Sequence, residues 1–192
     1  MAHKFDPKEM EKLDNPERRK TLPPLEILRS IGLRPDHTFL DVGAGTGYFS
    51  LEAARIIGPH GHVLALDSSP DMLQELNRRI VATGINNIDA LLCSEDGPSK
   101  PQPVADVALI AFVLHEVKDP KAFLSNIRKM LKARSRLAVI EWKKEPTEKG
   151  PPGYDRLAIK DVESFLSDSG YVLIESRPLN ASHYIVIAEN IL

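Results

Sequence analysis

Short apolar runs alternate along most of the chain with stretches in which apolar residues recur every three or four positions. The apolar runs predict buried strands, and the longer-spaced stretches predict amphipathic helices. The expected strands cover residues 39–42, 63–67, 88–93, 104–112, 136–142, 171–177 and 183–189. Because strands and helices alternate until a final hairpin, the pattern predicts an α/β fold with a mostly parallel sheet.

Helices are expected between the strands and ahead of the first one. Capping signals support two of them, since Ser69-Pro70 and Asp119-Pro120 each combine an N-cap side chain with a proline at the first helical position. The expected helices of the main domain cover residues 49–57, 70–80, 120–131 and 159–169. Two more are expected in residues 1–36: one begins at Asp6-Pro7 and is broken by Asn15-Pro16, and the other covers residues 24–31.

Composition limits the classes of function. A chain of 192 residues with 42% apolar and 27% charged residues fits one ordinary globular domain. The net charge is −2 and no basic stripe is present, so we expect no nucleic-acid partner. The lone Cys93 rules out an internal disulfide and any multi-cysteine zinc site, and we expect no metal. The chain shows neither a long apolar run nor a signal peptide, so we expect a cytoplasmic protein without membrane contact.

The candidate chemistry begins where the first strand runs into the turn Asp41-Val-Gly-Ala-Gly-Thr-Gly47. A strand, a glycine turn and a helix together bring backbone N–H groups up to a nucleotide-like ligand. The spacing is G-x-G-x-G, because Tyr48 stands where a dinucleotide fingerprint needs its third glycine. Asp67 ends the second strand 20 positions beyond Gly47, the offset of a carboxylate that binds ribose hydroxyls.

This combination resembles the class I S-adenosylmethionine-dependent methyltransferases, in the small-molecule branch that includes the ubiquinone/menaquinone-biosynthesis enzymes. The resemblance implies a Rossmann-like three-layer sandwich with strand order 3-2-1-4-5-7-6 and strand 7 antiparallel. It also implies that the chain transfers a methyl group from S-adenosyl-L-methionine to a small-molecule acceptor, leaving S-adenosyl-L-homocysteine. We expect a monomer or a homodimer.

The resemblance assigns cofactor-binding roles to residues at the ends of the first four strands. Asp41 and the turn amides would orient the methionyl end, and Asp67 would hold the ribose. Met72 and the turn after the third strand would hold the adenine, with Glu95 and Asp96 as equal candidates for its amino group. The full expected set is Asp41, Gly43, Ala44, Gly45, Gly47, Asp67, Ser68, Met72, Ser94, Glu95, Asp96 and Ala111.

His115 and Glu116 follow the fourth strand, opposite the glycine turn, where the strand order reverses and ligands collect. They are the candidate catalytic residues. If the acceptor must lose a proton, His115 is the natural base, because the unperturbed pKa of histidine lies near neutrality. The alternative interpretation of His115 is a loop or helix-capping imidazole.

The resemblance divides the chain into a helical extension, residues 1–36, and an S-adenosylmethionine-binding domain, residues 37–192. The extension is either a lid that closes over the cofactor and the acceptor or a helix that covers a sheet edge. Two other functions remain open at this point: a regulatory protein that binds the cofactor without catalysis, and a nicotinamide-dependent oxidoreductase.

Overall fold

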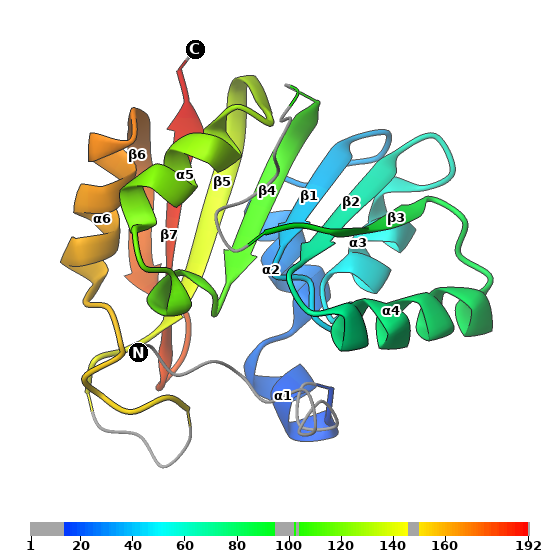
Figure 1. Cartoon of the computed structure of the whole chain (residues 1–192), viewed down its shortest axis with the longest axis horizontal. Coiled ribbons are helices and arrows are strands. Elements are labelled where there is room, and N and C mark those ends of the chain that lie inside the picture. The colour runs from blue at the N-terminus through cyan, green and yellow to red at the C-terminus, as the bar shows by residue number, and fades with distance from the viewer. Residues whose placement is uncertain (1–13, 95–101, 103, 146–149, 192) are drawn as a thin grey trace.

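The computed structural model describes residues 14–94, 102, 104–145 and 150–191. Its centre is a seven-stranded sheet with the order β3-β2-β1-β4-β5-β7-β6 (Figure 1). The strands are β1 (Thr38–Val42), β2 (His62–Asp67), β3 (Ile88–Leu92), β4 (Ala105–Ala111), β5 (Leu131–Trp142), β6 (Tyr171–Pro178) and β7 (His183–Asn190). The first five strands are parallel, and β7 runs antiparallel between β5 and β6. The expected fold class and strand order are confirmed.

Helices cover both faces of the sheet, as a parallel sheet requires. One face packs against α2 (Pro24–Ser30), α3 (Ser50–Ile57) and α4 (Pro70–Thr83). The other packs against the 3₁₀ helix η2 (Leu114–Glu116), α5 (Pro120–Arg128) and α6 (Ile159–Asp168). Two apolar clusters, one on each face, therefore form the core of a three-layer sandwich.

A short helix, α1 (Pro16–Thr21), lies beyond the edge of the sheet at which β4 ends (Figure 1). Sequence analysis did not predict it, and treated Asn15-Pro16 only as a break. In the structure Asn15 is the N-cap, accepting a hydrogen bond from the Arg18 backbone N–H at 2.9 Å, and Pro16 occupies the first helical position. Asparagine followed by proline is a helix-start signal, so the sequence did hold the information. The earlier helix expected at Asp6-Pro7 lies outside the described residues.

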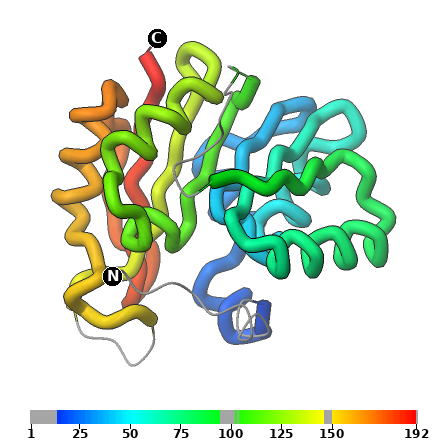
Figure 2. Tube along the Cα trace, viewed as in Figure 1, coloured from blue at the N-terminus to red at the C-terminus, as the bar shows by residue number. Residues whose placement is uncertain are grey.

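Strand β5 begins at Leu131, five positions earlier than the expected start at Arg136. The extra segment contains a register irregularity opposite β4 and a positive φ of 59° at Arg134. A mid-strand irregularity of this kind interrupts the apolar pattern, and the sequence pattern revealed only the part of the strand beyond it. After β5 the chain passes through α6 and β6 and turns back in the β6–β7 hairpin, and the end of β5 then pairs with the start of β7 (Figure 2).

Candidate functional site

The glycine turn after β1 has the backbone that glycine favours. Gly43, Gly45 and Gly47 have φ values of 74°, 54° and 86°. A β-carbon at Gly43 would collide with the side chain of Val113, and one at Gly47 would collide with Leu76. The turn therefore needs glycine for its backbone conformation and for close packing against neighbouring elements.

Two residues between these glycines complete the turn. The backbone N–H of Ala44, a buried residue, donates to the carbonyl of Leu66 at 2.9 Å, which ties the turn to β2. Thr46 is 1% exposed, and its hydroxyl has no hydrogen-bond partner among the described residues. Sequence reasoning missed Thr46. A buried hydroxyl without a partner is costly, so this one fits a cradle whose ligand supplies the partner.

Asp67 turns its carboxylate toward the glycine turn. The oxygen Oδ2 accepts a hydrogen bond from the Gly45 N–H, and Oδ1 accepts one from the Ser69 N–H, both at 2.8 Å. Each carboxylate oxygen can accept more than one hydrogen bond, so capacity remains for a ligand's hydroxyl groups. The neighbouring Ser68 is exposed. The structure thus brings the expected ribose-binding carboxylate to the turn.

Asp41 lies beneath the same turn and is 2% exposed. Its Oδ2 accepts a hydrogen bond from the Ser50 hydroxyl at 2.6 Å. Burial raises the pKa of Asp41 to about 7; the hydrogen bond from Ser50 opposes this rise, and the charge of Asp67 adds to it. A ligand cation placed near Asp41 would favour its ionised form.

The remaining expected cofactor residues are spread along the same sheet edge. Met72 is buried in the first turn of α4, Ser94 is exposed just beyond β3, and the partly buried Ala111 ends β4. Glu95 and Asp96 lie outside the described residues, so the choice between them stays open.

His115 forms a buried pair with Glu141, a residue that sequence reasoning did not select. The ring nitrogen Nδ1 lies 2.8 Å from Glu141 Oε2, and the His115 backbone N–H donates to Oε1 at 3.2 Å. Glu141 is fully buried at the end of β5, where a lone acid among apolar residues was the available signal. Burial lowers the pKa of His115, but the hydrogen bond and charge of Glu141 outweigh it and leave the pKa raised.

The pair orients the imidazole. When Nδ1–H donates to the Glu141 carboxylate, the neutral ring keeps its acceptor lone pair on Nε2. That nitrogen lies on the side of Glu116, whose Oε1 is 4.0 Å away. A histidine held in this tautomer by a buried carboxylate can accept a proton from a bound molecule.

An aromatic cluster lies on the opposite face of the sheet at the same edge. It consists of Phe112 after β4, Trp142 at the end of β5 and His183 at the start of β7. Phe112 has a φ of 62°, unusual for a bulky residue and typical of functional sites. Arg18 of α1 places its guanidinium 5.7 Å from the Phe112 ring and 4.4 Å from that of Tyr48. The N-terminal segment thus reaches the candidate site.

The described part of the chain gives little support for a reactive thiol, a metal site or a membrane-spanning helix. Burial raises the pKa of the partly buried Cys93 thiol to about 11, so it stays protonated at neutral pH. Residues 14–94, 102, 104–145 and 150–191 contain no group of three histidine, cysteine or acidic side chains placed to hold a metal ion. Within these ranges no helix has the length and apolar character needed to cross a bilayer.

Comparison with known proteins agrees with this geometry. Residues 33–150 match the family model described as a methyltransferase domain. The chain is 31% identical over 134 residues to the ubiquinone/menaquinone biosynthesis C-methyltransferase UbiE of Cellvibrio japonicus, covering 69% of this chain and 54% of that protein. The chain therefore spans about half the length of the curated relatives it matches.

Two solved structures share the fold. An S-adenosylmethionine-dependent methyltransferase from Aquifex aeolicus superposes with a TM-score of 0.93 at 30% identity, covering 98% of this chain and all of that one. The [4+2]-cyclase SpnF superposes with a TM-score of 0.78 at 14% identity, covering 100% of this chain and 87% of that one, a likeness of fold alone. The family match covers more than half of the chain and includes the glycine turn, Asp67 and His115. The chain belongs to the methyltransferase domain family and has the class I, Rossmann-like fold of the S-adenosylmethionine-dependent enzymes.

Proposed function

We propose that the chain transfers a methyl group from S-adenosylmethionine to a small-molecule acceptor, with His115 as the base. One observation carries this proposal. The glycine turn with its two carboxylates and the His115–Glu141 pair lie at one edge of the sheet, at the ends of the neighbouring strands β2, β1, β4 and β5. A cofactor cradle beside an oriented imidazole is what a proton-coupled group transfer needs.

The cofactor would be held by residues whose surroundings fit its parts. Asp67 would bind the ribose, the turn amides and Asp41 would face the amino-acid end, and Met72 would pack against the adenine. When bound, S-adenosylmethionine supplies a methyl group already activated on a sulfonium. The protein's task is then positioning, which can lower a barrier by roughly 7–11 kcal/mol.

His115 would remove the acceptor's proton at Nε2, and Glu141 would fix the tautomer and stabilise the imidazolium that forms. Glu141 does this without touching the acceptor, because its carboxylate is fully buried behind the ring. The UbiE relatives are C-methyltransferases, which favours carbon as the attacking atom. A carbon nucleophile must lose a proton from itself or from a conjugated hydroxyl, so such an acceptor would use this base.

The N-terminal extension, residues 1–36, would serve as a lid on this site. Its support is the position of Arg18 over Phe112 and Tyr48, and the hydrogen bond from the Tyr48 hydroxyl to the Leu22 carbonyl at 2.7 Å. Closure of such a segment keeps water out of the reacting centre. We further propose that the protein works in the cytoplasm as a monomer or homodimer, without nucleic acid.

Two measurements test the proposed function. Calorimetry should show that the chain binds S-adenosylhomocysteine and not NAD. Incubation with methyl-labelled S-adenosylmethionine and a panel of phenols, thiols, amines and carbon acids should transfer label to at least one acceptor class, and His115→Gln should reduce that transfer by about 100-fold or more. Binding without transfer to any acceptor would favour the alternative of a non-catalytic, cofactor-binding regulatory protein.

A further inference from the structure

His183 is a buried histidine that the proposed chemistry does not use. It opens β7 and is 6% exposed. Neither Nδ1 nor Nε2 has a hydrogen-bond partner in the part of the chain that the structure describes. A neutral imidazole carries one donor and one acceptor, so both polar functions of this ring are unsatisfied. Such groups in folded proteins call for an explanation, and a ligand is one.

The ring is held in place by aromatic neighbours. Trp142 faces His183 across the antiparallel β5–β7 pair, and the two ring centroids are 4.2 Å apart in an edge-on arrangement. Phe112 contacts the imidazole edge-on at 5.0 Å. A phenylalanine at position 183 would fill the same space and make the same ring contacts without unsatisfied nitrogens. Packing alone therefore does not account for histidine here.

The charges around His183 are positive. Burial, as the largest cause, and the charges of Arg18, Arg156 and Lys143 together lower its pKa to about 4. These cations come from α1, from the segment before α6 and from the residue just after β5. Among the residues that the structure describes, no acidic group contributes to this shift. A neutral hydrogen-bonding ring in a positive potential favours an oxygen that carries negative charge.

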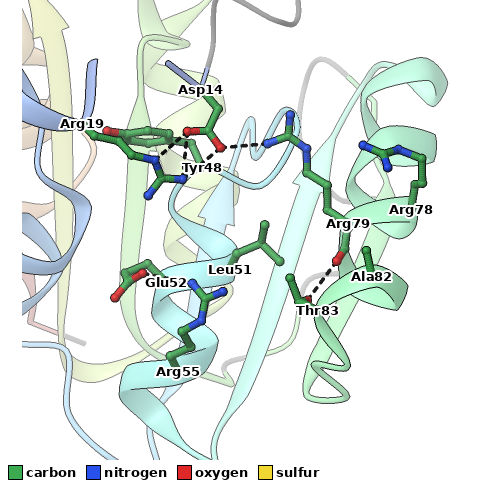
Figure 3. Close-up of a pocket in the computed structure, with 10 residues that line it drawn as sticks. All are labelled: Asp14, Arg19, Tyr48, Leu51, Glu52, Arg55, Arg78, Arg79, Ala82 and Thr83. Atoms are coloured by element: carbon green, nitrogen blue, oxygen red, sulfur yellow. Dashed lines mark hydrogen bonds and ion pairs between the residues drawn. The ribbon is translucent and has the colours of Figure 1, made fainter. Parts of the chain in front are cut away.

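Two segments cover the cluster. On one side, α1 has no buried residue and is attached by polar contacts: Asp14 pairs with Arg19 at 2.8 Å and with Arg79 at 3.0 Å (Figure 3). These three side chains line a cavity of about 290 Å³ between α1, α3 and α4. On the other side, a β-carbon at Gly150 would lie 2.8 Å from the Trp142 ring. Moving α1 aside would break these ion pairs, the contacts of Arg18 with the Tyr48 and Phe112 rings, and the Tyr48–Leu22 hydrogen bond, but it would expose no buried residue of α1 itself.

We propose that His183 anchors the methyl acceptor by a hydrogen bond to an anionic oxygen, with the acceptor's flat, conjugated body against Phe112 and Trp142 after α1 moves aside. The acceptor is then a planar conjugated acid bound as its anion, such as an aromatic carboxylate. This inference rests on the proposed function, because it names the acceptor class for that methyl transfer, with His183 and His115 on opposite faces of the sheet at its carboxyl edge. Arg156 and Lys143, which lie outside α1, contribute the positive potential. His183 contributes the directed hydrogen bond.

The test uses the full chain saturated with S-adenosylhomocysteine, with benzoate as the acidic probe and benzamide as its uncharged counterpart. Side-chain ¹⁵N NMR should show benzoate shifting the His183 resonances and raising the pH at which they titrate. Calorimetry should show benzoate binding at least tenfold more tightly than benzamide. Benzoate that binds without changing the His183 resonances, or does not bind to the saturated chain, would overturn the proposal.

Two variants separate ligand binding from packing. His183→Phe should keep its affinity for S-adenosylhomocysteine, melt at a higher temperature and lose at least tenfold in benzoate affinity. His37→Phe is the matched control, because Nδ1 of His37 is also buried without a partner but lies just before β1, at the opposite edge. It should bind benzoate as the wild type does. A lower melting temperature for His183→Phe, with benzoate affinity unchanged, would show a structural role instead.

The two proposals fail in distinguishable ways. Absence of S-adenosylhomocysteine binding contradicts the proposed function, whatever benzoate does. Normal S-adenosylhomocysteine binding together with failure of the benzoate measurements contradicts only the role of His183.

Discussion

The candidate site has two halves that differ in how the chain builds them. The cofactor half consists of Asp41, the Gly43–Gly47 turn and Asp67, and it comes from one stretch of chain around β1 and β2. The acceptor half consists of Phe112, His115, Glu141, Trp142 and His183, and it comes from three separate segments. In the cofactor half backbone N–H groups do most of the hydrogen bonding, as between Gly45 and Asp67. In the acceptor half side chains meet side chains across strands, as His115 meets Glu141.

The two histidines of the acceptor half also differ from each other, in the charges that surround them and in the direction of their pKa shifts. His115 has a buried carboxylate partner and a raised pKa, whereas His183 has cations nearby and a lowered one. The same side chain is thereby suited to accept a proton on one face of the sheet and to remain neutral on the other. Neighbouring charge decides the role of each imidazole.

The largest effect on cofactor binding should come from distorting the backbone of the glycine turn in the cofactor half. Gly45→Val places a β-branched side chain at a φ of 54°, in the turn that faces the ligand. We expect complete loss of S-adenosylhomocysteine binding in calorimetry, or a chain that does not fold. Gly84→Val is the control, since Gly84 has a similar φ of 69° but nothing within 4 Å of its β-carbon position. That variant should lose stability and keep its affinity; normal binding by Gly45→Val would mean that the turn is not the cradle.

The second-largest effect should be on the pH dependence of the free energy of unfolding, through the protonation of Asp41. Its pKa is about 7 in the folded chain against an ordinary value of 3.8, so between these values the folded chain holds a proton that the unfolded chain has lost. Stability should therefore fall as pH rises from about 4 to about 7, by an amount on the order of 4 kcal/mol. Asp41→Asn should abolish this slope in urea titrations and be more stable than the wild type at pH 8.

Asp106 is the control for this pH dependence, because its pKa shift has the opposite sign to that of Asp41. Burial raises its pKa, but hydrogen bonds from Lys132 and from the Thr38 N–H outweigh burial and leave the pKa lowered. Its contribution to stability is present above the unfolded pKa and is lost as pH falls. Asp106→Asn should therefore leave the decline between pH 4 and pH 7 in place. An equal slope in Asp41→Asn and wild type would show that Asp41 is not the titrating group.

A smaller effect is expected at Asp67. Asp67→Ala removes the carboxylate that would bind the ribose and that accepts from the Gly45 and Ser69 N–H groups. Two charge-assisted hydrogen bonds of about 1.5–3 kcal/mol each imply at least a tenfold loss of S-adenosylhomocysteine affinity. Asp89→Ala, at an exposed carboxylate on β3, should not change it. Calorimetry giving equal affinities for both variants would remove Asp67 from the site.

The smallest expected effect is a shift in the pH dependence of methyl transfer, caused by a substitution in the acceptor half. Glu141→Gln removes the charge that raises the pKa of His115. Methyl transfer needs the neutral base, so activity should rise with pH through the pKa of His115. The rising limb should move to lower pH in the variant. NMR titration of His115 gives an independent measurement, and an unchanged limb in both would show that Glu141 does not tune this base.

The difference between the cofactor half and the acceptor half also explains which parts of the fold and of the site could be predicted from the sequence. The glycine turn and Asp67 follow from local spacing, because each signal lies within one strand–turn–helix unit. The strand order was implied by the family resemblance that these signals carry. Glu141, Trp142 and His183 could not be grouped in advance, because their proximity depends on the antiparallel register of β5 and β7. Arg18 was missed because α1 was not expected. The assigned role of each cofactor-half residue stays a prediction, although the structure brings most of them together.

The position of β7 has a consequence for the order in which the site can be assembled. It is the last strand in the chain but lies inside the sheet, between β5 and β6. During synthesis the edge of β5 therefore remains unpaired after β1 to β4 can already have associated, and unpaired edges are where chains mispair. The cofactor half can form early and the aromatic cluster only when His183 has been added. A nascent chain would thus acquire its cradle before it acquires the anchor for its second substrate.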